Sequence, residues 1–268
     1  MSVLQAVFLG LVQGLTEFLP VSSSGHLVLF QRLMNTDLGG ADMLFDLTLH
    51  LGTLFSVCVA MRKHIFALFK KPFKKLLYLI VATIPAGLAG VFLGDFIDGI
   101  FFGGAYLAAG FAISAALLAA AQICAKKREG IPPLKFSQAA WMGVAQAVAV
   151  IPGISRSGAT VAAGIMAGGN KDEVASFSFL LSIPVILGGF VVELYKGLSD
   201  GSLLQAFSFS QGNLGLCVAV SVATSAAAGL FAIKVMLKCI SSAKYTSFIV
   251  YLCFLALVCG GLKLYGVL

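Results

Sequence analysis

Apolar segments long enough to cross a lipid bilayer recur along the whole chain, and this pattern restricts the possible folds more than any other feature. Of the 268 residues, 59% are hydrophobic and only 11% are charged, whereas soluble domains carry about 25% charged residues. About 20 apolar residues cross the hydrocarbon core as a helix. We therefore predict one all-α integral membrane domain over 1–268, with full transmembrane helices at about 41–61, 76–94, 104–124, 174–195, 213–237 and 246–265.

Two further apolar segments, about 2–33 and 137–169, each contain a break that a straight membrane helix would not tolerate. The first break reads LPVSSSG at 19–25 and the second reads IPGISRSG at 151–158. Non-helical backbone at membrane depth persists only where protein or a wet cavity satisfies its polar groups. We therefore expect each segment to form a re-entrant pair of half-helices that enters and leaves on the same side.

The basic residues predict the orientation, because loops rich in Lys and Arg stay on the cytoplasmic side. Fourteen of the 18 Lys and Arg residues fall on one predicted side, in MRKHIFALFKKPFKKLL (61–77), in AKKREGIPPLK (125–135) and at Lys171, Lys234, Lys238 and Lys244. The opposite side holds Arg32, Lys196 and Lys263, and Arg156 lies in the second break. This asymmetry explains the net charge of +7 without a nucleic-acid partner, and it places both chain ends on the non-cytoplasmic side.

The two breaks belong to a repeat that a shift of 133 residues reveals without a gap. Six of the 19 positions between 10–28 and 143–161 are identical, namely Gly10/Gly143, Gln13/Gln146, Ser22/Ser155, Ser24/Ser157, Gly25/Gly158 and Val28/Val161. Each copy, about 1–125 and about 134–268, would hold one broken segment and three spans. Because three is odd, the second copy would be inverted. In such inverted repeats, broken helices meet near the midplane and form the binding site.

The two copies of the repeat carry different residues at three positions where a catalytic site would need different chemical groups. Glu17 aligns with Val150, Ser23 with Arg156, and His26 with Ala159. The first copy therefore offers acid-base and nucleophilic groups, and the second offers a fixed positive charge.

Glu17 and Gln13 are one helical turn apart, so a helix places both on one face. Ionisable groups at membrane depth are costly and are mostly functional or paired. A carboxylate and an amide oxygen are ligands that hard cations such as Mg²⁺ or Ca²⁺ prefer. We predict that they bind a divalent cation or that Glu17 acts in acid-base chemistry. The alternative is a carboxylate at the membrane interface that faces water.

Three serines follow Pro20 and are predicted to begin the second half-helix. Ser22 or Ser24 could serve only as an N-cap, but free amides at a helix start with hydroxyls beside them also form an anion site. We therefore assign Ser22 and Ser24 to substrate binding. His26 follows Ser23 by about one turn, close enough to activate that hydroxyl or to protonate a leaving group. The pair is predicted to be catalytic, and a structural histidine is the alternative.

Arg156 is the strongest single signal in the second break. A buried guanidinium needs a counter-anion, and its planar fork matches phosphate oxygens in pairs. The alternative is a structural ion pair with Glu17 between the two copies. Neighbouring hydroxyls, and glycines that allow close approach of a ligand to the backbone, extend the predicted substrate-binding site; they are Ser155, Ser157, Thr160, Gly153 and Gly158.

Asp46 and His50 lie one turn apart in the first full span. We expect a mutual hydrogen bond that faces the helix bundle.

The motifs around these residues resemble those of the undecaprenyl pyrophosphate phosphatases of the bacitracin-resistance type. That family carries a Glu or Gln followed four residues later by Glu, here QGLTE at 13–17, and then PVSSxGH, here 20–26. It also carries PGxSRSxxT, here 152–160. The motifs occur in order and the similarity covers essentially the whole chain. Many members have Glu where this chain has Gln13, which leaves Glu17 as the sole charged ligand for a cation.

The resemblance implies hydrolysis of undecaprenyl diphosphate to the monophosphate lipid carrier of cell-wall synthesis. It implies a divalent cation, Mg²⁺ or Ca²⁺, and a multi-pass protein of the bacterial inner membrane with its active site facing outward. Arg156 with its neighbouring hydroxyls would then hold phosphate, and Ser23 would be the nucleophile with His26 as general acid or base. His26 itself or a metal-bound water are alternative nucleophiles. The partners are the polyprenyl lipid and the bilayer, and the sequence allows a homo-oligomer.

A lipid flippase or secondary transporter is the alternative function, because inverted repeats around broken helices are typical of transporters. A transporter needs no nucleophile, so the Ser23 and His26 pair favours the enzyme. An ion channel would require a ring of carbonyls or charges, and the sequence has no such repeat.

Overall fold

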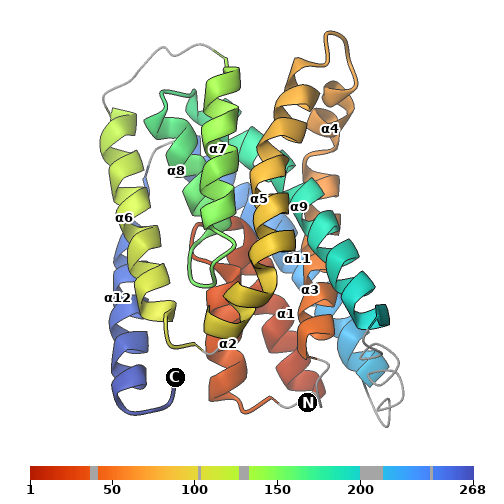
Figure 1. Cartoon of the computed structure of the whole chain (residues 1–268), viewed down its shortest axis with the longest axis vertical. Coiled ribbons are helices and arrows are strands. Elements are labelled where there is room, and N and C mark those ends of the chain that lie inside the picture. The colour runs from red at the N-terminus through yellow and green to blue at the C-terminus, as the bar shows by residue number, and fades with distance from the viewer. Residues whose placement is uncertain (37–41, 102–103, 127–132, 200–213, 242–243) are drawn as a thin grey trace.

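The computed structural model describes residues 1–36, 42–101, 104–126, 133–199, 214–241 and 244–268, and its regular structure there is helical (Figure 1). This confirms the predicted all-α fold class for the described ranges. Lys127 and Arg128 of the second basic loop lie outside those ranges, as do residues 41 and 213 at the starts of two predicted spans.

Each of the six predicted spans corresponds to a helix. The helices are α3 (Asp42–Ala60), α5 (Lys74–Phe101), α6 (Leu107–Lys126), α9 (Lys171–Ser199), α11 (Leu214–Ser241) and α12 (Thr246–Leu264). Among the described residues, five helices are long and apolar enough to cross a membrane, and α3 makes a sixth span when it is taken together with α4 (Arg62–Leu68), which bends away from it by 76°. The helix α4 was not predicted, since its residues belong to the first basic loop.

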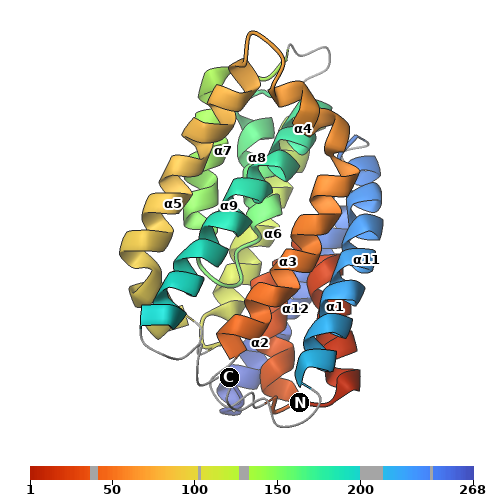
Figure 2. The same ribbon diagram turned by 90° about the vertical axis from the view of Figure 1, so that its right-hand side faces the viewer.

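The two broken segments form the predicted pairs of short helices. In the first segment α1 (Val3–Phe18) is followed by α2 (Ser23–Leu33), and in the second α7 (Phe136–Val148) is followed by α8 (Arg156–Met166). Figures 1 and 2 agree in placing α1 and α2 in the half of the molecule that contains both chain ends, and α7 and α8 in the half that contains α4.

Local chemistry explains why the helices stop at these breaks. Leu19, the C-cap of α1, has extended backbone angles of φ −71° and ψ 147°, because a residue before proline is pushed out of the helical region. Gly153 in the second break has a φ of 91°, a conformation that glycine adopts without a steric penalty. The next helices begin with serine N-caps: Ser22 Oγ accepts from the Gly25 amide at 3.3 Å and Ser155 Oγ from the Gly158 amide at 3.1 Å.

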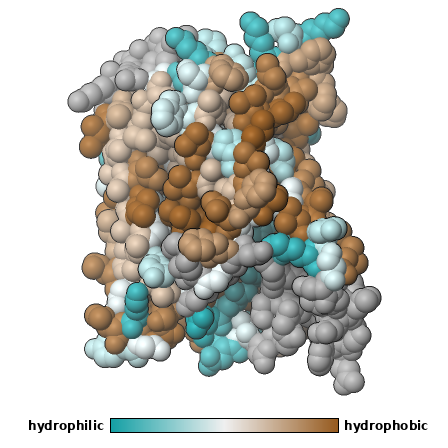
Figure 3. Space-filling view, in the orientation of Figure 1, coloured by the Kyte–Doolittle hydropathy of each residue, from teal (hydrophilic) through white to brown (hydrophobic). Residues whose placement is uncertain are grey.

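The outer surface matches a lipid environment. Apolar residues spread across the middle of the face in Figure 3, and hydrophilic residues gather toward its two ends. Large exposed apolar side chains follow α5 along its length: Leu77, Ile80, Ile84, Leu88, Val91, Phe92 and Leu93. The polar breaks between α1 and α2 and between α7 and α8 are instead enclosed by the bundle.

Candidate active site

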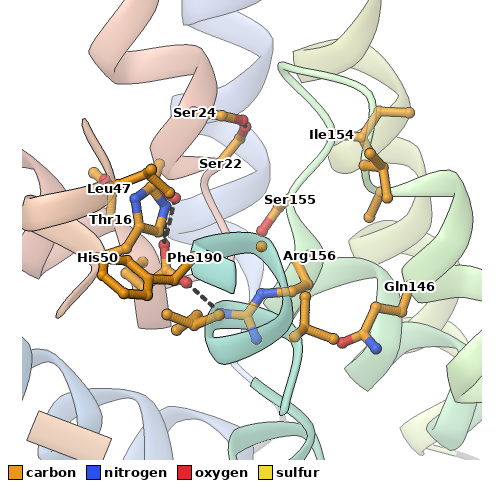
Figure 4. A pocket seen from close by; sticks show the side chains of 17 residues that line it. Thr16, Ser22, Ser24, Leu47, His50, Gln146, Ile154, Ser155, Arg156 and Phe190 are labelled. Carbon is orange, nitrogen blue, oxygen red and sulfur yellow. Dashed lines mark hydrogen bonds and ion pairs between the residues drawn. The ribbon is translucent and has the colours of Figure 1, made fainter. Parts of the chain in front are cut away.

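A pocket of about 250 Å³ lies where the two breaks meet. Its polar lining comes from both halves of the chain and consists of Thr16, Glu17, Ser22, Ser23, Ser24, His50, Gln146, Ser155 and Arg156. The apolar part of its wall includes Leu47 of α3, Val150 and Ile154 of the second break, and Val185, Ile186 and Phe190 of α9. Figure 4 shows these side chains gathering around Arg156.

The centre of the pocket is an ion pair between Glu17 and Arg156. A guanidinium Nη2 donates to Oε1 of the carboxylate. The Glu17 side chain is only 4% exposed and the Arg156 side chain 16%, so the alternative of an interfacial carboxylate facing water is wrong. The ion pair considered as an alternative for Arg156 is present, and it joins residues 139 positions apart in sequence.

The second carboxylate oxygen of Glu17 is surrounded by three further polar groups. Ser23 Oγ donates to Oε2 at 2.6 Å, and Gln13 Nε2 donates to the same oxygen at 3.0 Å. His50 Nε2 lies 3.7 Å from it. The predicted nucleophile therefore contacts the carboxylate, and the carboxylate contacts the arginine. This chain of contacts places a hydroxyl, a proton acceptor and a cation within one small site.

His26 lies beside this cluster but faces away from it. The residue is 1% exposed; Nδ1 is 2.7 Å from the carbonyl oxygen of Ser22, and Nε2 is 2.7 Å from the hydroxyl of Tyr251 on α12. Since a carbonyl oxygen only accepts, Nδ1 carries a proton, and in a neutral ring Nε2 then accepts from the Tyr251 hydroxyl. In this conformation both ring nitrogens hold the first break in place, and the hydroxyl of Ser23 bonds to Glu17.

The backbone of the first break is strained at the residue that His26 holds. Ser22 has a φ of 70°, which is uncommon for a residue with a side chain and is found most often at functional sites. Its carbonyl oxygen accepts from both the backbone amide and the ring of His26, at 3.2 and 2.7 Å. These contacts fix the direction in which the serines face.

Of the other hydroxyl residues predicted in the second break, one lines the pocket and two are buried outside its lining. Ser155 lines the pocket and caps α8. Ser157 is buried and donates to the carbonyl oxygen of Leu19 at 3.0 Å, so that it ties the second break to the first. Thr160 is buried and bonded within α8 and to Ser178 of α9. Ser157 and Thr160 do not line the pocket.

The glycines of the two breaks allow their backbones to touch. A β-carbon on Gly25 would lie 3.0 Å from Cα of Gly153, and one on Gly158 would lie 3.3 Å from Cβ of Pro20. Gly153 and Gly158 therefore permit close packing of the breaks, and neither lines the pocket.

Three residues of the site were not predicted in these roles. His50 bonds through Nδ1 to the backbone carbonyl of Asp46 at 2.7 Å and turns Nε2 toward Glu17, whereas Asp46 Oδ1 accepts from Gln31. Asp46 and His50 are therefore hydrogen-bonded as expected, but through the backbone carbonyl of Asp46 and not through its carboxylate. Gln146 lines the pocket, and Tyr251 bonds to His26, which holds the first break. A histidine within an apolar span is unusual, and this feature of the sequence could have indicated that His50 belongs to the site.

The donors predicted for a divalent cation, Glu17 and Gln13, are adjacent and buried on α1. Gln13 turns Nε2 toward the carboxylate of Glu17, and its Oε1 has no hydrogen-bond partner among the described residues. A rotation of the amide would turn this oxygen to a cation bound at the carboxylate, and oxygen ligands are those that Mg²⁺ and Ca²⁺ prefer. The described part of the chain contains no group of three or more His, Cys, Asp and Glu side chains arranged to hold a metal. Further ligands would therefore be substrate oxygens and water, as is usual for Mg²⁺.

Comparison with known proteins identifies close relatives over nearly the whole chain. The family described as "Bacitracin resistance protein BacA" matches residues 6–258. The chain is 40% identical over 252 residues to the undecaprenyl-diphosphatase of Carboxydothermus hydrogenoformans, with 94% of each chain covered. It is 38% identical over 258 residues to that of Halothermothrix orenii, again with 94% of each covered. It is 35% identical to that of Korarchaeum cryptofilum over 268 residues, covering 94% of this chain and 95% of the relative.

Proposed function

The chain belongs to the family of the bacitracin resistance protein BacA, and from this premise we propose that it is an undecaprenyl-diphosphatase. It removes the terminal phosphate of undecaprenyl diphosphate and leaves the monophosphate lipid carrier that cell-wall synthesis reuses. The observation that carries the proposal is that Ser23 and Arg156, from breaks far apart in sequence, bind the same buried carboxylate in one pocket.

Binding of substrate begins with an exchange of anions at Arg156. A diphosphate competes with Glu17 for the guanidinium, whose five N–H donors match phosphate oxygens in pairs. The N-termini of α2 and α8, with the hydroxyls of Ser22, Ser24 and Ser155 beside them, add favourable positions for negative charge. When Arg156 turns to the phosphate, the carboxylate of Glu17 is free to accept a proton.

Ser23 then attacks the terminal phosphorus. A bond forms between Ser23 Oγ and phosphorus, the bond from phosphorus to the bridging oxygen breaks, and the lipid monophosphate leaves. The hydroxyl proton passes to Glu17, whose Oε2 already accepts that hydrogen bond at 2.6 Å. Glu17 gives this proton to the departing lipid monophosphate and becomes a carboxylate again. Water next attacks the phosphoserine: its oxygen bonds to phosphorus, the bond from phosphorus to Ser23 Oγ breaks, one proton of the water restores the Ser23 hydroxyl, and inorganic phosphate leaves. Arg156 balances the charge on the transferring phosphoryl group throughout.

His26 has a supporting role in the conformation described here. It holds the backbone of Ser22 and therefore the direction of Ser23. Action of His26 as a general acid or base, or as the nucleophile, would require its ring to leave Ser22 and Tyr251, and direct attack by water remains the other route. A phosphorylated Ser23 that can be trapped distinguishes these routes.

A divalent cation, Mg²⁺ or Ca²⁺, fits the oxygen donors of Glu17 and Gln13. When bound, it would neutralise charge on the diphosphate oxygens. The unpaired Oε1 of Gln13 supports this part of the proposal.

The lipid tail lies outside the pocket. A cavity of about 250 Å³ is smaller than the roughly 300–1,000 Å³ of typical small-molecule sites, so it admits the diphosphate and not a polyprenyl chain. Apolar side chains of the second break and of α9 line the pocket, and they offer a wall along which the first isoprene units can leave toward lipid; they include Val150, Ile154, Val185 and Ile186.

The two halves, about 1–125 and 134–268, are proposed to be inverted repeats whose broken segments are re-entrant. Contacts between the halves occur in matched pairs. Gly25 approaches Gly153, and Gly158 approaches Pro20; these contacts exchange under the shift of 133. Likewise a β-carbon on Gly10 would lie 2.5 Å from the carbonyl oxygen of Ser221 on α11, and one on Gly143 would lie 2.6 Å from that of Ala82 on α5. Reciprocal contacts of this kind are expected around a two-fold axis.

We propose that the protein lies in the bacterial inner membrane with its pocket open to the exterior. In support of this orientation, the excess of Lys and Arg predicts that the end of the molecule that contains α4 faces the cytoplasm. Leu47 and His50 lie in the first half of α3, and Ile186 and Phe190 in the second half of α9. Both sets are nearer the opposite end, where the chain termini lie (Figure 1).

The experiment that tests the function measures phosphate release from undecaprenyl diphosphate by the purified protein in detergent, with and without a chelator. Detergent leaves no compartment to cross, so turnover there supports an enzyme, whereas a flippase or transporter would release no phosphate. Turnover that a chelator abolishes and added Mg²⁺ or Ca²⁺ restores supports the cation. A protein that binds the lipid and releases no phosphate under any of these conditions would refute the proposed function.

A further inference from the structure

Gln146 is a buried polar side chain that the mechanism above leaves without a role. It lies on α7, its exposed fraction is 1%, and it nevertheless lines the pocket. Neither Nε2 nor Oε1 has a hydrogen-bond partner within the described residues. Buried polar groups in folded proteins are nearly always paired, so an unpaired amide next to a cavity calls for a ligand.

The repeat explains how this amide came to be unpaired. Gln146 and Gln13 correspond under the shift of 133, and each precedes its break on the final turns of a helix. Gln13 donates to Glu17, four residues later on the same face. Four residues after Gln146 stands Val150, which offers no acceptor. Gln146 therefore keeps the amide of its counterpart Gln13. The counterpart of Glu17, which accepts from Gln13, is the apolar residue Val150.

Its position relative to the reacting groups indicates what it binds. In the view of Figure 4, Arg156 lies between His50 on one side and Gln146 on the other. Ser23 and His50 both contact Glu17, so the terminal phosphate that Ser23 attacks belongs on their side of Arg156. Ile154, an apolar residue of the pocket wall, lies on the same side of Arg156 as Gln146 in that view, and an apolar wall suits the lipid-bearing end of the substrate.

We propose that the Nε2 amide of Gln146 donates a hydrogen bond to the inner phosphate, the one that stays on the lipid. This inference rests on the proposed function. Gln146 would help to recognise a lipid diphosphate and would hold the leaving group while the terminal phosphate transfers. Its unpaired state before binding is a cost in stability that the substrate removes.

The test replaces Gln146 with methionine, which has similar volume and no hydrogen-bonding amide. Because the change removes an unsatisfied buried group, the variant should unfold in detergent at the same temperature as the parent protein or higher. Its kcat/KM for undecaprenyl diphosphate should fall about 10- to 100-fold, as expected for one hydrogen bond to a charged group. The Kd of undecaprenyl monophosphate, measured by titration without turnover, should rise by a similar factor, while inhibition by inorganic phosphate should stay unchanged.

Gln122→Met serves as the matched control. Gln122 lies on α6, accepts from the Tyr245 amide at 2.9 Å and from the Thr246 hydroxyl at 3.2 Å, and does not line the pocket. Its loss should lower the unfolding temperature and leave the Kd of the monophosphate lipid unchanged.

Two results for Gln146→Met would overturn the inference. Unchanged kcat/KM and lipid Kd would show that the amide does not contact substrate, and the proposed function would stand if the parent protein still releases phosphate. A lower unfolding temperature with unchanged lipid Kd would show a purely structural role. If the parent protein itself binds the lipid without releasing phosphate, the proposed function fails, and the binding titration still decides the role of Gln146.

Discussion

Arg156→Ala should lower both the free energy of unfolding and kcat/KM, and a second substitution at Glu17 should restore only the free energy of unfolding. The change leaves the Glu17 carboxylate, 4% exposed, without its cation. Removing one partner of a buried ion pair costs about 3–5 kcal/mol, and the remaining contacts of Glu17 with Ser23, Gln13 and His50 place the cost near the lower end, about 3 kcal/mol. Glu17→Gln in the same chain removes the stranded charge, so the double variant should regain most of the lost stability.

Catalysis should not recover with stability. A guanidinium that holds phosphate through two charge-assisted hydrogen bonds contributes about 1.5–3 kcal/mol through each, so kcat/KM should fall about 10²- to 10⁴-fold in Arg156→Ala and should stay low in the double variant. The assay is phosphate release from undecaprenyl diphosphate, paired with thermal unfolding in the same detergent at one scan rate. An Arg156→Ala enzyme within tenfold of the parent, or a double variant that is no more stable than the single one, would refute the reasoning.

Three further predictions follow from the same contacts. Ser23→Ala should abolish phosphate release and phosphoenzyme formation while leaving the ion pair of Glu17 and the unfolding temperature nearly unchanged; robust turnover would shift the attack to His26 or water. Tyr251→Phe removes the hydroxyl that bonds to His26 and should lower kcat by about tenfold or less, whereas the same rate as the parent would mean that this bond does not position the break. In a variant without the six native cysteines, a cysteine replacing Lys263 should react with a membrane-impermeant thiol reagent added to intact cells, and reaction only after lysis would contradict the proposed orientation.

The helices and their breaks were predictable because both depend on local chemistry. Runs of apolar residues predicted the helices, and Pro20 and the N-cap Ser22 stand where the first break was expected to end one helix and begin the next. The bend between α3 and α4 was missed, since the lysines and arginines that predict a cytoplasmic loop say nothing about its secondary structure.

The members of the site were partly predictable. Glu17, Ser23 and Arg156 stood out because charge and hydroxyl groups are rare within apolar segments, and the repeat indicated that their segments meet. The pairing of Ser23 with His26, expected from a spacing of one turn, is absent in the described conformation, where Ser23 bonds to Glu17 and His26 to Ser22 and Tyr251. Helical spacing gives proximity, but the direction of a side chain also depends on neighbours from other helices.

The sequence by itself determined that this chain is a helical membrane protein with two polar interruptions, because hydrophobic length and backbone hydrogen bonding leave a segment in lipid few other choices. Only the tertiary structure decided which groups share a carboxylate and which amide has no partner. Those facts depend on how α1, α3, α7 and α12 pack across the two halves, and contacts between residues more than a hundred positions apart, such as His26 with Tyr251, leave no periodic trace in the sequence of either partner.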